Sequence, residues 1–463
     1  MNEAFFGKPA RAVGTMLALL ALPYLIPGAE RLRVARAPWA AEDEGEPAVE
    51  TTEHTVAPTL ASGELEVKAN ENTSSNALPT RAGDAPELRA LNLPKGDFLE
   101  RPQAMRAFYE ALAALERGEE RVVRIAYYGD SILTSDYVSG TARRLLQARY
   151  GDGGHGFLTV ANPWEWYFHN DVAHYAGGGW RASRVTGPLT KDGDYGPGGV
   201  VFRGGAGASA SFGTAKDGDY GRKVSRFSIL YAAGPDGGTL ELKPSTGEPS
   251  ELDTKADVAA PKLHVVEVPD GEAKLVIRVL RGDVKLYGVA LERKSGLVLD
   301  ALGALGARAR IWNNLNGDAL ARVYALRPPT LIAVQLGTNE SEDGAVNVAE
   351  YKQTLGALID KFRAAAPEAA FLLVSPPDRA DKGPSGELRS NRVLVKIVEL
   401  QRQIAEEKGV AFFDTFRAMG GAGAMGRWLH MHPQLCSADL THPTAAGAEA
   451  LGRLLVEGIQ GAH

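Results

Sequence analysis

Serine, histidine and aspartate residues at two distant points of the chain are of the types that acyl transfer requires. Ser131 follows Gly129 and Asp130 at the end of an apolar stretch, and Asp439 stands three residues before His442. Acyl transfer needs a nucleophile, a base within hydrogen-bonding reach of it, and a carboxylate that fixes the tautomer of the base. A spacing of three residues allows one turn to direct Asp439 and His442 toward a single point. The three side chains are therefore candidates for a serine-based catalytic site.

Two further positions could supply hydrogen-bond donors to an oxyanion. Asn339 carries a side-chain N–H₂ group, and Gly306 offers a backbone N–H that no side chain obstructs. The N–H groups at the start of a helix after Ser131 would also be partly unpaired. Donors that converge where negative charge develops are a requirement of acyl transfer. These groups are therefore candidate oxyanion donors.

The segment around Ser131 has a layout that would present its hydroxyl group. Residues 125–128, after Arg124, are apolar and rich in β-formers, and residues 137–150 place apolar side chains at helical spacing. A strand, a turn and a helix in this order carry a side chain to the carboxyl edge of a parallel sheet, where such folds bind ligands. By itself, Gly-Asp-Ser fits an ordinary turn before a helix equally well. The rest of the chain must decide between the two interpretations.

Strands and helices alternate through most of the second half of the chain. The apolar runs at 331–336 and 370–374 are typical of buried parallel strands, and the first of them leads into Gly337-Thr338-Asn339. This alternation predicts an α/β protein with a doubly wound, flavodoxin-like parallel sheet and right-handed crossovers. The other expected elements are helices over 101–117, 351–365, 391–408 and 445–460, and a short strand at 410–413.

A different pattern occupies residues 161–292. This stretch is rich in Gly and contains short runs of alternating apolar residues, for example at 227–231, 274–279 and 284–291. Several strands separated by Gly and Pro turns indicate an all-β insert of the sandwich or jelly-roll kind. Five aromatic residues gather at its start and could stack on sugar rings, although aromatic residues in β-domains are more often core. They are Trp164, Trp166, Tyr167, Trp180 and Tyr195.

The amino terminus has the order of an export signal. Lys8 and Arg11 precede an apolar run from Ala12 to Ile26, which is short for a membrane span of ~20 residues. We expect either a cleaved signal peptide or an uncleaved membrane anchor, with a buried amino-terminal helix as the alternative. The composition that follows cannot bury enough surface to offset its ordering entropy, and it predicts a disordered linker. The expected organisation is a signal or anchor (1–29), the linker (30–95), the first part of the α/β domain (96–160), the insert (161–292) and the second part (293–463).

Composition excludes several other classes of protein. The 463 residues carry a net charge of −6, and no basic stripe appears, which argues against nucleic-acid binding. The single cysteine, Cys436, excludes an intrachain disulfide and a cysteine zinc cage. Because Cys436 has no basic neighbour, we expect a packed thiol and not a reactive one. His430, His432, His442 and Asp439 could form a metal site, but no helix or strand period sets them on one face. No metal or cofactor is expected.

Taken together and in this order, the candidate residues resemble the SGNH (GDSL-type) esterase and lipase superfamily. Gly-Asp-Ser at 129–131 is similar to its first block, Gly306 to its second, Gly-Thr-Asn at 337–339 to its third, and Asp-Leu-Thr-His at 439–442 to its last. The resemblance implies Ser131 as nucleophile, His442 as base and Asp439 as the residue that orients it. It implies an oxyanion hole of the Ser131 and Gly306 backbone amides with the Asn339 side chain, and Gly303 is the alternative to Gly306.

Four shorter motifs resemble one bacterial branch of this superfamily. They are Ser-Asp-Tyr-Val-Ser-Gly at 135–140, Arg-Tyr-Gly-Asp-Gly-Gly-His-Gly-Phe at 149–157, Pro-Pro-Asp-Arg at 376–379 and the glycine-rich stretch at 419–428. That branch has a β-sandwich insert and includes exported esterases that remove O-acetyl groups from peptidoglycan. Ile132 departs from the histidine that close relatives often carry there. The resemblance thus implies a serine esterase acting on an acylated cell-envelope glycan.

Two other functions use the same residues. An O-acyltransferase would form the same acyl-enzyme and pass the acyl group to a sugar hydroxyl instead of water. A catalytically inactive glycan-binding protein is the third hypothesis, and the filled triad positions argue against it. The expected partners are an acylated glycan or small ester, with a membrane tether through the amino-terminal segment if that segment is not cleaved.

Overall fold

The computed structural model describes residues 63–67, 70–73, 93–164 and 166–463. The predicted signal or anchor at 1–29 and most of the predicted linker lie outside these residues. In the described part of the chain, no helix is both long and apolar enough to cross a membrane.

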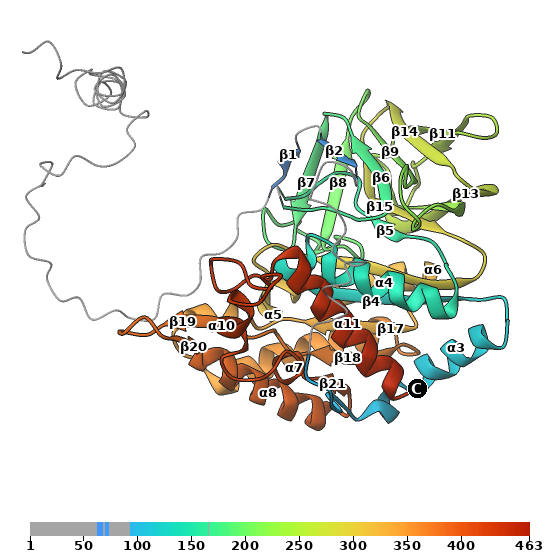
Figure 1. The fold of residues 1–463 in the computed structure, drawn as a ribbon. Coiled ribbons are helices and arrows are strands. Elements are labelled where there is room, and N and C mark those ends of the chain that lie inside the picture. Colours follow the sequence, from blue (N-terminus) through green and yellow to red (C-terminus); the bar gives the residue numbers. More distant parts are fainter. Residues whose placement is uncertain (1–62, 68–69, 74–92, 165) are drawn as a thin grey trace, which may run out of the picture. The chain divides into compact units, whose positions relative to one another are not determined.

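A six-stranded sheet carries the α/β part of the molecule (Figure 1). Five of its strands are parallel, and numbering them in chain order gives the spatial order 2-1-3-4-5. A short sixth strand pairs antiparallel with the last of them. In spatial order the strands are β16 (Gly296–Gly303), β4 (Val122–Gly129), β17 (Leu331–Gln335), β18 (Ala370–Val374), β21 (Ala411–Phe413) and β3 (Leu99–Glu100).

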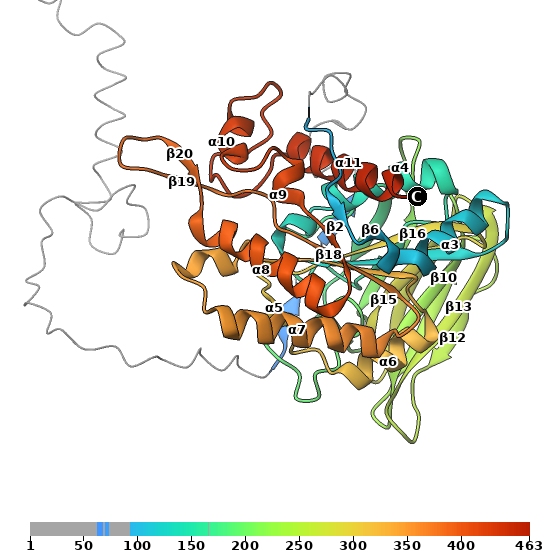
Figure 2. The same cartoon turned by 90° about the horizontal axis from the view of Figure 1, so that it is seen from below.

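Helices cover both faces of this sheet, as Figure 2 shows. Successive residues of β4 point to opposite faces: Ile125 and Tyr127 pack in the core under the first group of helices, whereas Ala126 and Tyr128 pack in the core under the second. The first group comprises α3 (Arg106–Glu116), α4 (Tyr137–Tyr150) and α11 (Ala445–Gly461). The second comprises α6 (Gly317–Leu326), α7 (Val348–Ala365) and α8 (Arg392–Lys408).

The middle of the chain forms two antiparallel sheets that share one hydrophobic core. One sheet has the order β1 (Leu65–Val67), β7 (Trp180–Arg184), β8 (Val200–Gly204), β15 (Val284–Glu292), β10 (Val224–Ala233) and β13 (Ala260–Gly271), with β5 (Gly156–Leu158) also on β15. The other has the order β12 (Ser250–Asp253), β11 (Thr239–Pro244), β14 (Lys274–Arg281), β9 (Ser209–Thr214), β6 (Val172–Ala176) and β2 (Asn70–Thr73). We refer to these two sheets as the insert.

Two predicted boundaries need correction. The prediction of a disordered linker over 30–95 is wrong for β1 and β2, which pair with β7 and β6 as edge strands of the insert. Their ordering comes from main-chain hydrogen bonds to a preformed sheet edge, which local composition does not reveal. The insert also begins earlier than residue 161, because β5 pairs with β15.

Buried ion pairs join the insert to the α/β part. Glu292, at the end of β15, accepts hydrogen bonds from Arg124 of β4 at 2.6 Å and from Arg327, after α6, at 3.1 Å. Arg327 also forms a paired contact with Asp300 of β16. Burial raises the pKa of Glu292, but the arginines lower it more, to about 2. The carboxylate therefore stays ionised, and the insert is fixed on the sheet that carries the candidate site.

Candidate active site

Ser131 stands immediately beyond the carboxyl end of β4. The strand stops at Gly129, where a Cβ atom would lie 2.6 Å from the side chain of Leu133, so this turn has room only for glycine. Asp130 caps the short 3₁₀ helix Ser131–Leu133 by accepting a hydrogen bond from the N–H of Ile132 at 3.1 Å. The predicted strand–turn–helix layout thus places the Ser131 hydroxyl at the edge of the sheet.

His442 and Asp439 meet Ser131 in a continuous hydrogen-bonded chain. Ser131 Oγ lies 2.9 Å from His442 Nε2, and His442 Nδ1 lies 2.7 Å from Asp439 Oδ2. The serine is 311 positions away from the histidine in sequence, and only the fold brings them together. A neutral imidazole whose Nδ1–H is held by a carboxylate presents the Nε2 lone pair to the serine hydroxyl. This geometry is that of an activated serine.

The turn that carries His442 is held by backbone hydrogen bonds. Ser437 N–H donates to the carbonyl oxygen of His442 at 2.8 Å, and Ala380 N–H donates to that of Leu440 at 2.9 Å. Leu440 has a φ of 60°, which a side chain such as leucine adopts only when its surroundings impose it. The Leu440 side chain is buried. These contacts over-determine the turn and so fix the direction of the imidazole.

Asp439 is stabilised as a carboxylate. Its Oδ1 accepts the backbone N–H groups of Thr441 and His442, both at 2.9 Å, while Oδ2 accepts the His442 ring. Partial burial raises the pKa of Asp439, but the hydrogen bonds from His442 and Thr441 lower it more, and the pKa falls below its ordinary value. The surroundings of Asp439 therefore favour its ionised form.

Gly306 and Asn339 lie on two loops, one after β16 and one after β17. The loop after β16 turns at Gly306, which has a φ of 70°, and the Gly306 N–H has no hydrogen-bond acceptor among the described residues. The Asn339 side chain donates to the carbonyl oxygen of Ala307 at 2.9 Å, which uses one of its two N–H bonds. A second N–H of Asn339 and the N–H of Gly306 remain for an oxyanion.

Gly303, the alternative to Gly306, is built into the sheet. It ends β16, paired with Gly129, and a Cβ atom there would lie 2.8 Å from the backbone of Thr134. Its glycine character is explained by this close packing against the serine turn. Gly306 is the position whose N–H is available.

A cavity of about 590 Å³ opens over Ser131, Asp439 and His442, whereas Gly306 and Asn339 are not among its lining residues. This volume lies within the range of ~300–1,000 Å³ that small-molecule sites occupy. Its walls come from the serine turn and α4, from the 437–448 segment, from Leu305, and from Trp166 and Phe168 at the start of the insert. The catalytic candidates therefore face a binding space to which the insert contributes directly.

The comparisons with known proteins assign part of the chain to a family. The model of the GDSL-like lipase/acylhydrolase family matches residues 278–450. This range contains Gly306, Asn339, Asp439 and His442. The matched residues form a GDSL-like lipase/acylhydrolase domain, and this domain makes the chain an ester hydrolase. The match begins inside the insert, in β14, so Ser131 and most of the insert lie outside it.

Two solved structures illustrate what this chain resembles in fold. A structure described as a peptidoglycan O-acetylesterase in action has a TM-score of 0.66 and 22% identity, and the match covers 79% of this chain and 98% of that one. At this identity the likeness establishes the SGNH hydrolase fold. A family two carbohydrate esterase from Cellvibrio japonicus matches with a TM-score of 0.25 and 14% identity, over 57% of this chain and 91% of that one. No curated protein matched the sequence.

Sequence analysis missed Glu340 in this GDSL-type site. Glu340 follows Asn339, and its Oε1 accepts the backbone N–H of Ala309 at 2.9 Å. Asn339 and Glu340 thus hold the Gly306 loop at two successive points. Burial raises the pKa of Glu340 to about 7. The position of Glu340 next to a predicted oxyanion residue was the one hint of its role in the sequence. The sequence does not show that Ala309 lies beside Glu340.

The five aromatic residues at the start of the insert divide into two groups. Trp164, Tyr167, Trp180 and Tyr195 are buried in its core, as aromatic residues in β-domains usually are. Trp166 is 66% exposed and lines the catalytic cavity. Trp164, Trp166 and Tyr167 lie in one loop without a regular period, so the sequence could not separate Trp166 from its two neighbours.

The metal alternative finds no support in the described residues. The only group there with metal-ligand spacing is Asp136, His155 and His169, and it does not include His430 or His432. All four lone-pair positions of Asp136 are taken, by Arg143, Ser139 and the N–H of Asn170. A cation placed there would also lie beside the Arg143 guanidinium. This group is better explained as a structural ion pair.

Cys436 is a buried thiol next to the histidine turn. Its Sγ donates to the carbonyl oxygen of Ser437, and burial raises the pKa of the thiol to about 11. A thiol with a raised pKa is a poor nucleophile. The prediction of a packed thiol agrees with this environment.

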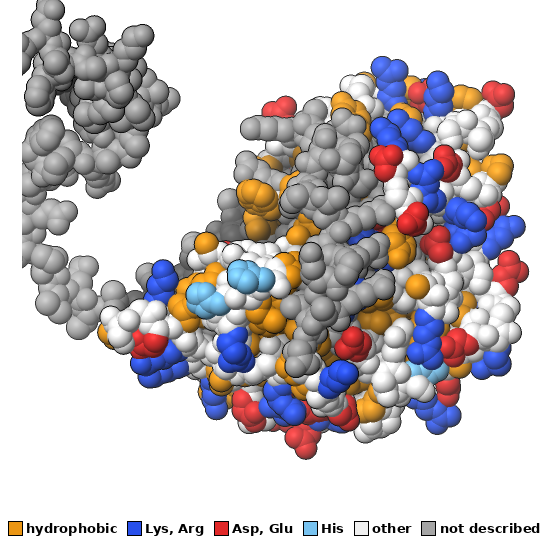
Figure 3. Space-filling model, viewed as in Figure 1, with side chains coloured by type: hydrophobic (Ala, Val, Ile, Leu, Met, Phe, Trp, Pro, Cys, Tyr) orange, Lys and Arg blue, Asp and Glu red, His pale blue; other side chains and the backbone are white. Residues whose placement is uncertain are grey.

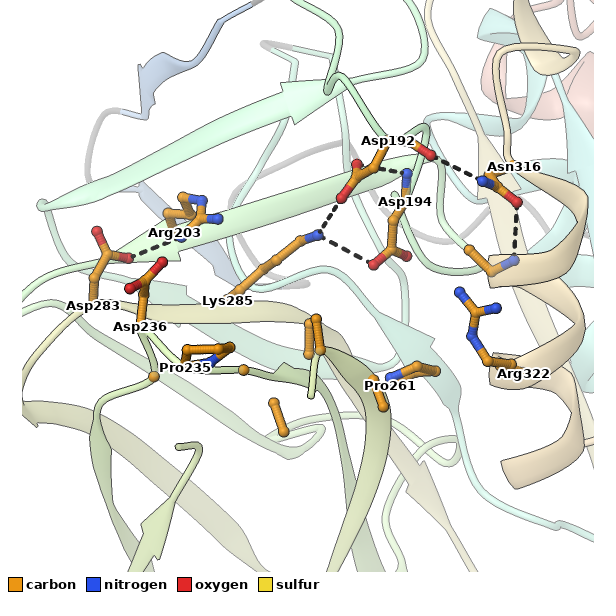
Figure 4. A pocket seen from close by; sticks show the side chains of 17 residues that line it. Asp192, Asp194, Arg203, Pro235, Asp236, Pro261, Asp283, Lys285, Asn316 and Arg322 are labelled. Carbon is orange, nitrogen blue, oxygen red and sulfur yellow. Dashed lines mark hydrogen bonds and ion pairs between the residues drawn. The ribbon is translucent and has the colours of Figure 1, made fainter. Parts of the chain in front are cut away.

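A second cavity, of about 240 Å³, lies where the insert meets α6 (Figure 4). Its charges are largely paired within the protein, since Lys285 bonds to Asp192 and Asp194, and Arg203 faces Asp283. Asn316 caps α6 and also donates to the backbone of Asp192. None of the residues expected to catalyse acyl transfer lines this cavity. We interpret it as part of the joint between the insert and the GDSL-type domain.

Proposed function

We propose that the protein is an exported serine esterase that removes O-acetyl groups from a cell-envelope glycan such as peptidoglycan. The observation that carries the proposal is the hydrogen-bonded chain from Ser131 through His442 to Asp439, at 2.9 and 2.7 Å, in a domain of an ester-hydrolase family. The flavodoxin-like strand order and the two antiparallel sheets support the finer assignment of fold, a doubly wound core with an all-β insert.

The reaction proceeds through an acyl-enzyme. Ser131 Oγ attacks the ester carbonyl carbon while His442 Nε2 accepts the hydroxyl proton, and Asp439 stabilises the imidazolium. The tetrahedral intermediate then breaks its bond to the sugar oxygen, which takes the proton from His442 and leaves as an alcohol. A water molecule attacks the acyl-enzyme, again giving its proton to His442. Collapse of this second intermediate releases acetic acid and restores the Ser131 hydroxyl.

The oxyanion of both intermediates is bound by three donors. These are the backbone N–H groups of Ser131 and Gly306 and the free N–H bond of Asn339. Donors that are already in place when charge develops need no reorganisation, and each one is worth about 10²–10³ in rate. The bond from Asn339 to Ala307 keeps the two loop donors in register before substrate arrives.

Two observations support the substrate class. The match to the structure described as a peptidoglycan O-acetylesterase covers 79% of this chain and 98% of that one. The cavity is lined by no lysine or arginine among the described residues, which suits a neutral ester better than an anionic one. Export is supported by the basic and apolar order of residues 8–26. A fusion of residues 1–95 to alkaline phosphatase, which is active only after export, tests this part.

Hydrolysis of 4-nitrophenyl acetate and of O-acetylated peptidoglycan by the full chain tests the activity. Ser131→Ala is expected to abolish turnover, whereas Ser385→Ala, in an exposed turn that does not line the cavity, is the matched control. Turnover that survives in Ser131→Ala would overturn the proposal. Measuring free acetate with and without added chitotriose separates hydrolysis from transfer to a sugar hydroxyl. No release of acetate from either ester would instead favour a glycan-binding protein.

A further inference from the structure

The cavity over Ser131 has one wall that the catalytic chemistry does not use. Trp166 is the only exposed tryptophan in the part of the chain that the structure describes. The Phe168 ring lies 6.4 Å from the Trp166 ring, centroid to centroid, with the two planes at 79°. Leu305, which is also exposed, and Tyr137 line the same cavity. Apolar side chains that gather on one exposed wall are costly to leave in water, and they are typical of a binding surface.

The loop that carries this wall is attached to the serine turn. Phe168 N–H donates to the carbonyl oxygen of Thr134 at 2.8 Å, three residues after the nucleophile. The Asn170 side chain donates to the carbonyl oxygen of Asp136 at 2.8 Å, and its backbone N–H donates to the Asp136 carboxylate at 2.9 Å. The aromatic wall is therefore set at a fixed position relative to Ser131.

A network of buried ion pairs also fixes the position of this loop. Arg143 of α4 binds the Asp136 carboxylate, and Arg144 binds that of Asp171 at 2.6 Å. Both aspartates have a positive φ, 53° for Asp136 and 60° for Asp171, which the network stabilises. Tyr167 and His169, which alternate with Phe168, are buried beneath it. Such attachment makes the wall a preorganised surface, so that binding a ligand there costs little ordering entropy.

The chemistry of the surroundings narrows the occupant. Polar groups of Thr134, Ser135 and Ser437 line the cavity beside the aromatic wall, and no lysine or arginine is among its described lining residues. An exposed indole with hydroxyl groups near it suits a ligand with one apolar face and polar edges. A pyranose ring has this shape, because its C–H bonds form flat faces and its hydroxyls lie at the rim. A long acyl chain would instead need an enclosed apolar slot.

We infer that Trp166 and Phe168, contributed by the insert, form a stacking surface for the pyranose ring that bears the scissile ester. The insert then determines specificity at the catalytic centre itself. This inference rests on the proposed esterase function, because it assigns the sugar-binding side of the same cavity. In this arrangement the sugar stacks on the indole while its ester carbonyl reaches the Ser131 hydroxyl.

The test compares kcat/KM for two acetate esters that differ in the presence of a sugar. Ethyl acetate has no ring, and chemically O-acetylated chitotriose carries pyranose rings. The variants are Trp166→Ala, Trp166→Phe and, as matched control, Tyr175→Ala, an exposed aromatic residue of β6 that does not line the cavity. Acetate release is followed at constant pH. Because Trp166 is exposed, none of these changes removes core packing.

We expect the ratio of kcat/KM for the acetylated sugar to that for ethyl acetate to fall about tenfold in Trp166→Ala. Trp166→Phe should keep most of the ratio, and Tyr175→Ala all of it. An unchanged ratio in Trp166→Ala would overturn the inference while leaving the esterase intact. A larger loss on ethyl hexanoate than on the acetylated sugar would show an acyl-chain wall and overturn it as well. If the unmodified protein hydrolyses neither ester, the proposed function itself fails.

Discussion

The side-chain amide of Asn339 donates a hydrogen bond to the carbonyl oxygen of Ala307, 2.9 Å away. Ala307 directly follows Gly306, so this bond joins the loop after β17 to the loop after β16. The two loops carry the expected oxyanion donors from separate blocks of sequence. We therefore expect the oxyanion hole to depend on Asn339 in two ways, because its side chain would donate to the oxyanion and it links the two loops.

Asn339→Ala should lower kcat by about 10²–10³ with a smaller change in KM, because a donor used mainly in the transition state is lost. Asn313→Ala is the control, since Asn313 makes a similar side-chain bond, to the carbonyl oxygen of Thr354 at 2.9 Å, and is not one of the expected oxyanion donors. Steady-state kinetics with 4-nitrophenyl acetate measure both variants. Equal losses in the two variants would mean that Asn339 acts only through loop stability.

Gly306→Ala and Gly303→Ala should separate activity from stability. At Gly306 a Cβ atom meets nothing within 4 Å, but the φ of 70° strains an alanine by ~1 kcal/mol, so the N–H should move and kcat should fall. At Gly303 the Cβ would overlap the backbone of Thr134, so the protein should unfold at a lower temperature. Thermal unfolding and kinetics on both variants check this. A Gly306→Ala enzyme with unchanged kcat would remove Gly306 from the oxyanion hole.

Much of the catalytic geometry could be predicted because it follows from local signals. Ser131 and Asn339 each come just beyond a strongly apolar strand, and parallel strands end at one edge of the sheet. The helix expected over 137–150 has the same bounds in the structure. Asp439 and His442 share one short turn, so their pairing needed no long-range information.

The remaining features depend on contacts that sequence patterns do not encode. Glu340 gains its role from Ala309, which a separate loop brings to it. Trp166 is exposed and Trp164 is buried in the same irregular loop, where no periodicity assigns a face. β1 has no strong strand signal of its own and is ordered by the edge of β7. Such tertiary contacts override local composition.

Asp439→Asn should lower kcat by about 10³–10⁴, because an amide no longer selects the tautomer in which Nε2 accepts the serine proton. We expect the decrease in kcat to lie near the lower end of this range. The side chains of Asp439 and His442 are 50% and 44% exposed, so water can partly replace the carboxylate. In the unmodified enzyme the lowered pKa keeps Asp439 ionised in mild acid. Steady-state kinetics with 4-nitrophenyl acetate measure the variant, and an unchanged kcat would contradict the assignment of Asp439 as the residue that orients His442.

Glu340→Gln should change how stability depends on pH. Burial raises the pKa of Glu340 to about 7, so the folded state holds a proton that the unfolded chain releases near its ordinary pKa of 4.5. The stability that this proton contributes is present below pH 4.5 and is lost as the pH rises to about 7. The glutamine variant should therefore gain relative to the unmodified protein at pH 8 and not at pH 4.5. Thermal unfolding at the two pH values measures the difference, and a constant difference would refute it.

Three buried histidines should make the protein lose stability in acid. Burial lowers the pKa of His155 well below its ordinary value and that of His169 and His174 to about 4. Around them, Arg143 lowers the pKa of His155 and His169, whereas the Asp136 carboxylate raises it. Their net shift means that the unfolded chain binds protons below about pH 6.5 that the folded protein does not accept. Stability is therefore fully present above pH 6.5 and falls as the pH drops toward 4.

His174→Gln tests this linkage at one of the three positions. His174 Nε2 donates to the carbonyl oxygen of Val160 at 3.0 Å, and a glutamine amide can replace that donor but cannot be protonated. Each buried histidine steepens the loss by up to ~1.4 kcal/mol per pH unit between its two pKa values. The variant should start less stable at pH 7.5, because it loses the stacking on Phe212, yet its stability should decline less steeply below pH 6.5. Urea unfolding at half-unit pH intervals gives both slopes. Parallel slopes would show that His174 does not remain neutral in the folded protein.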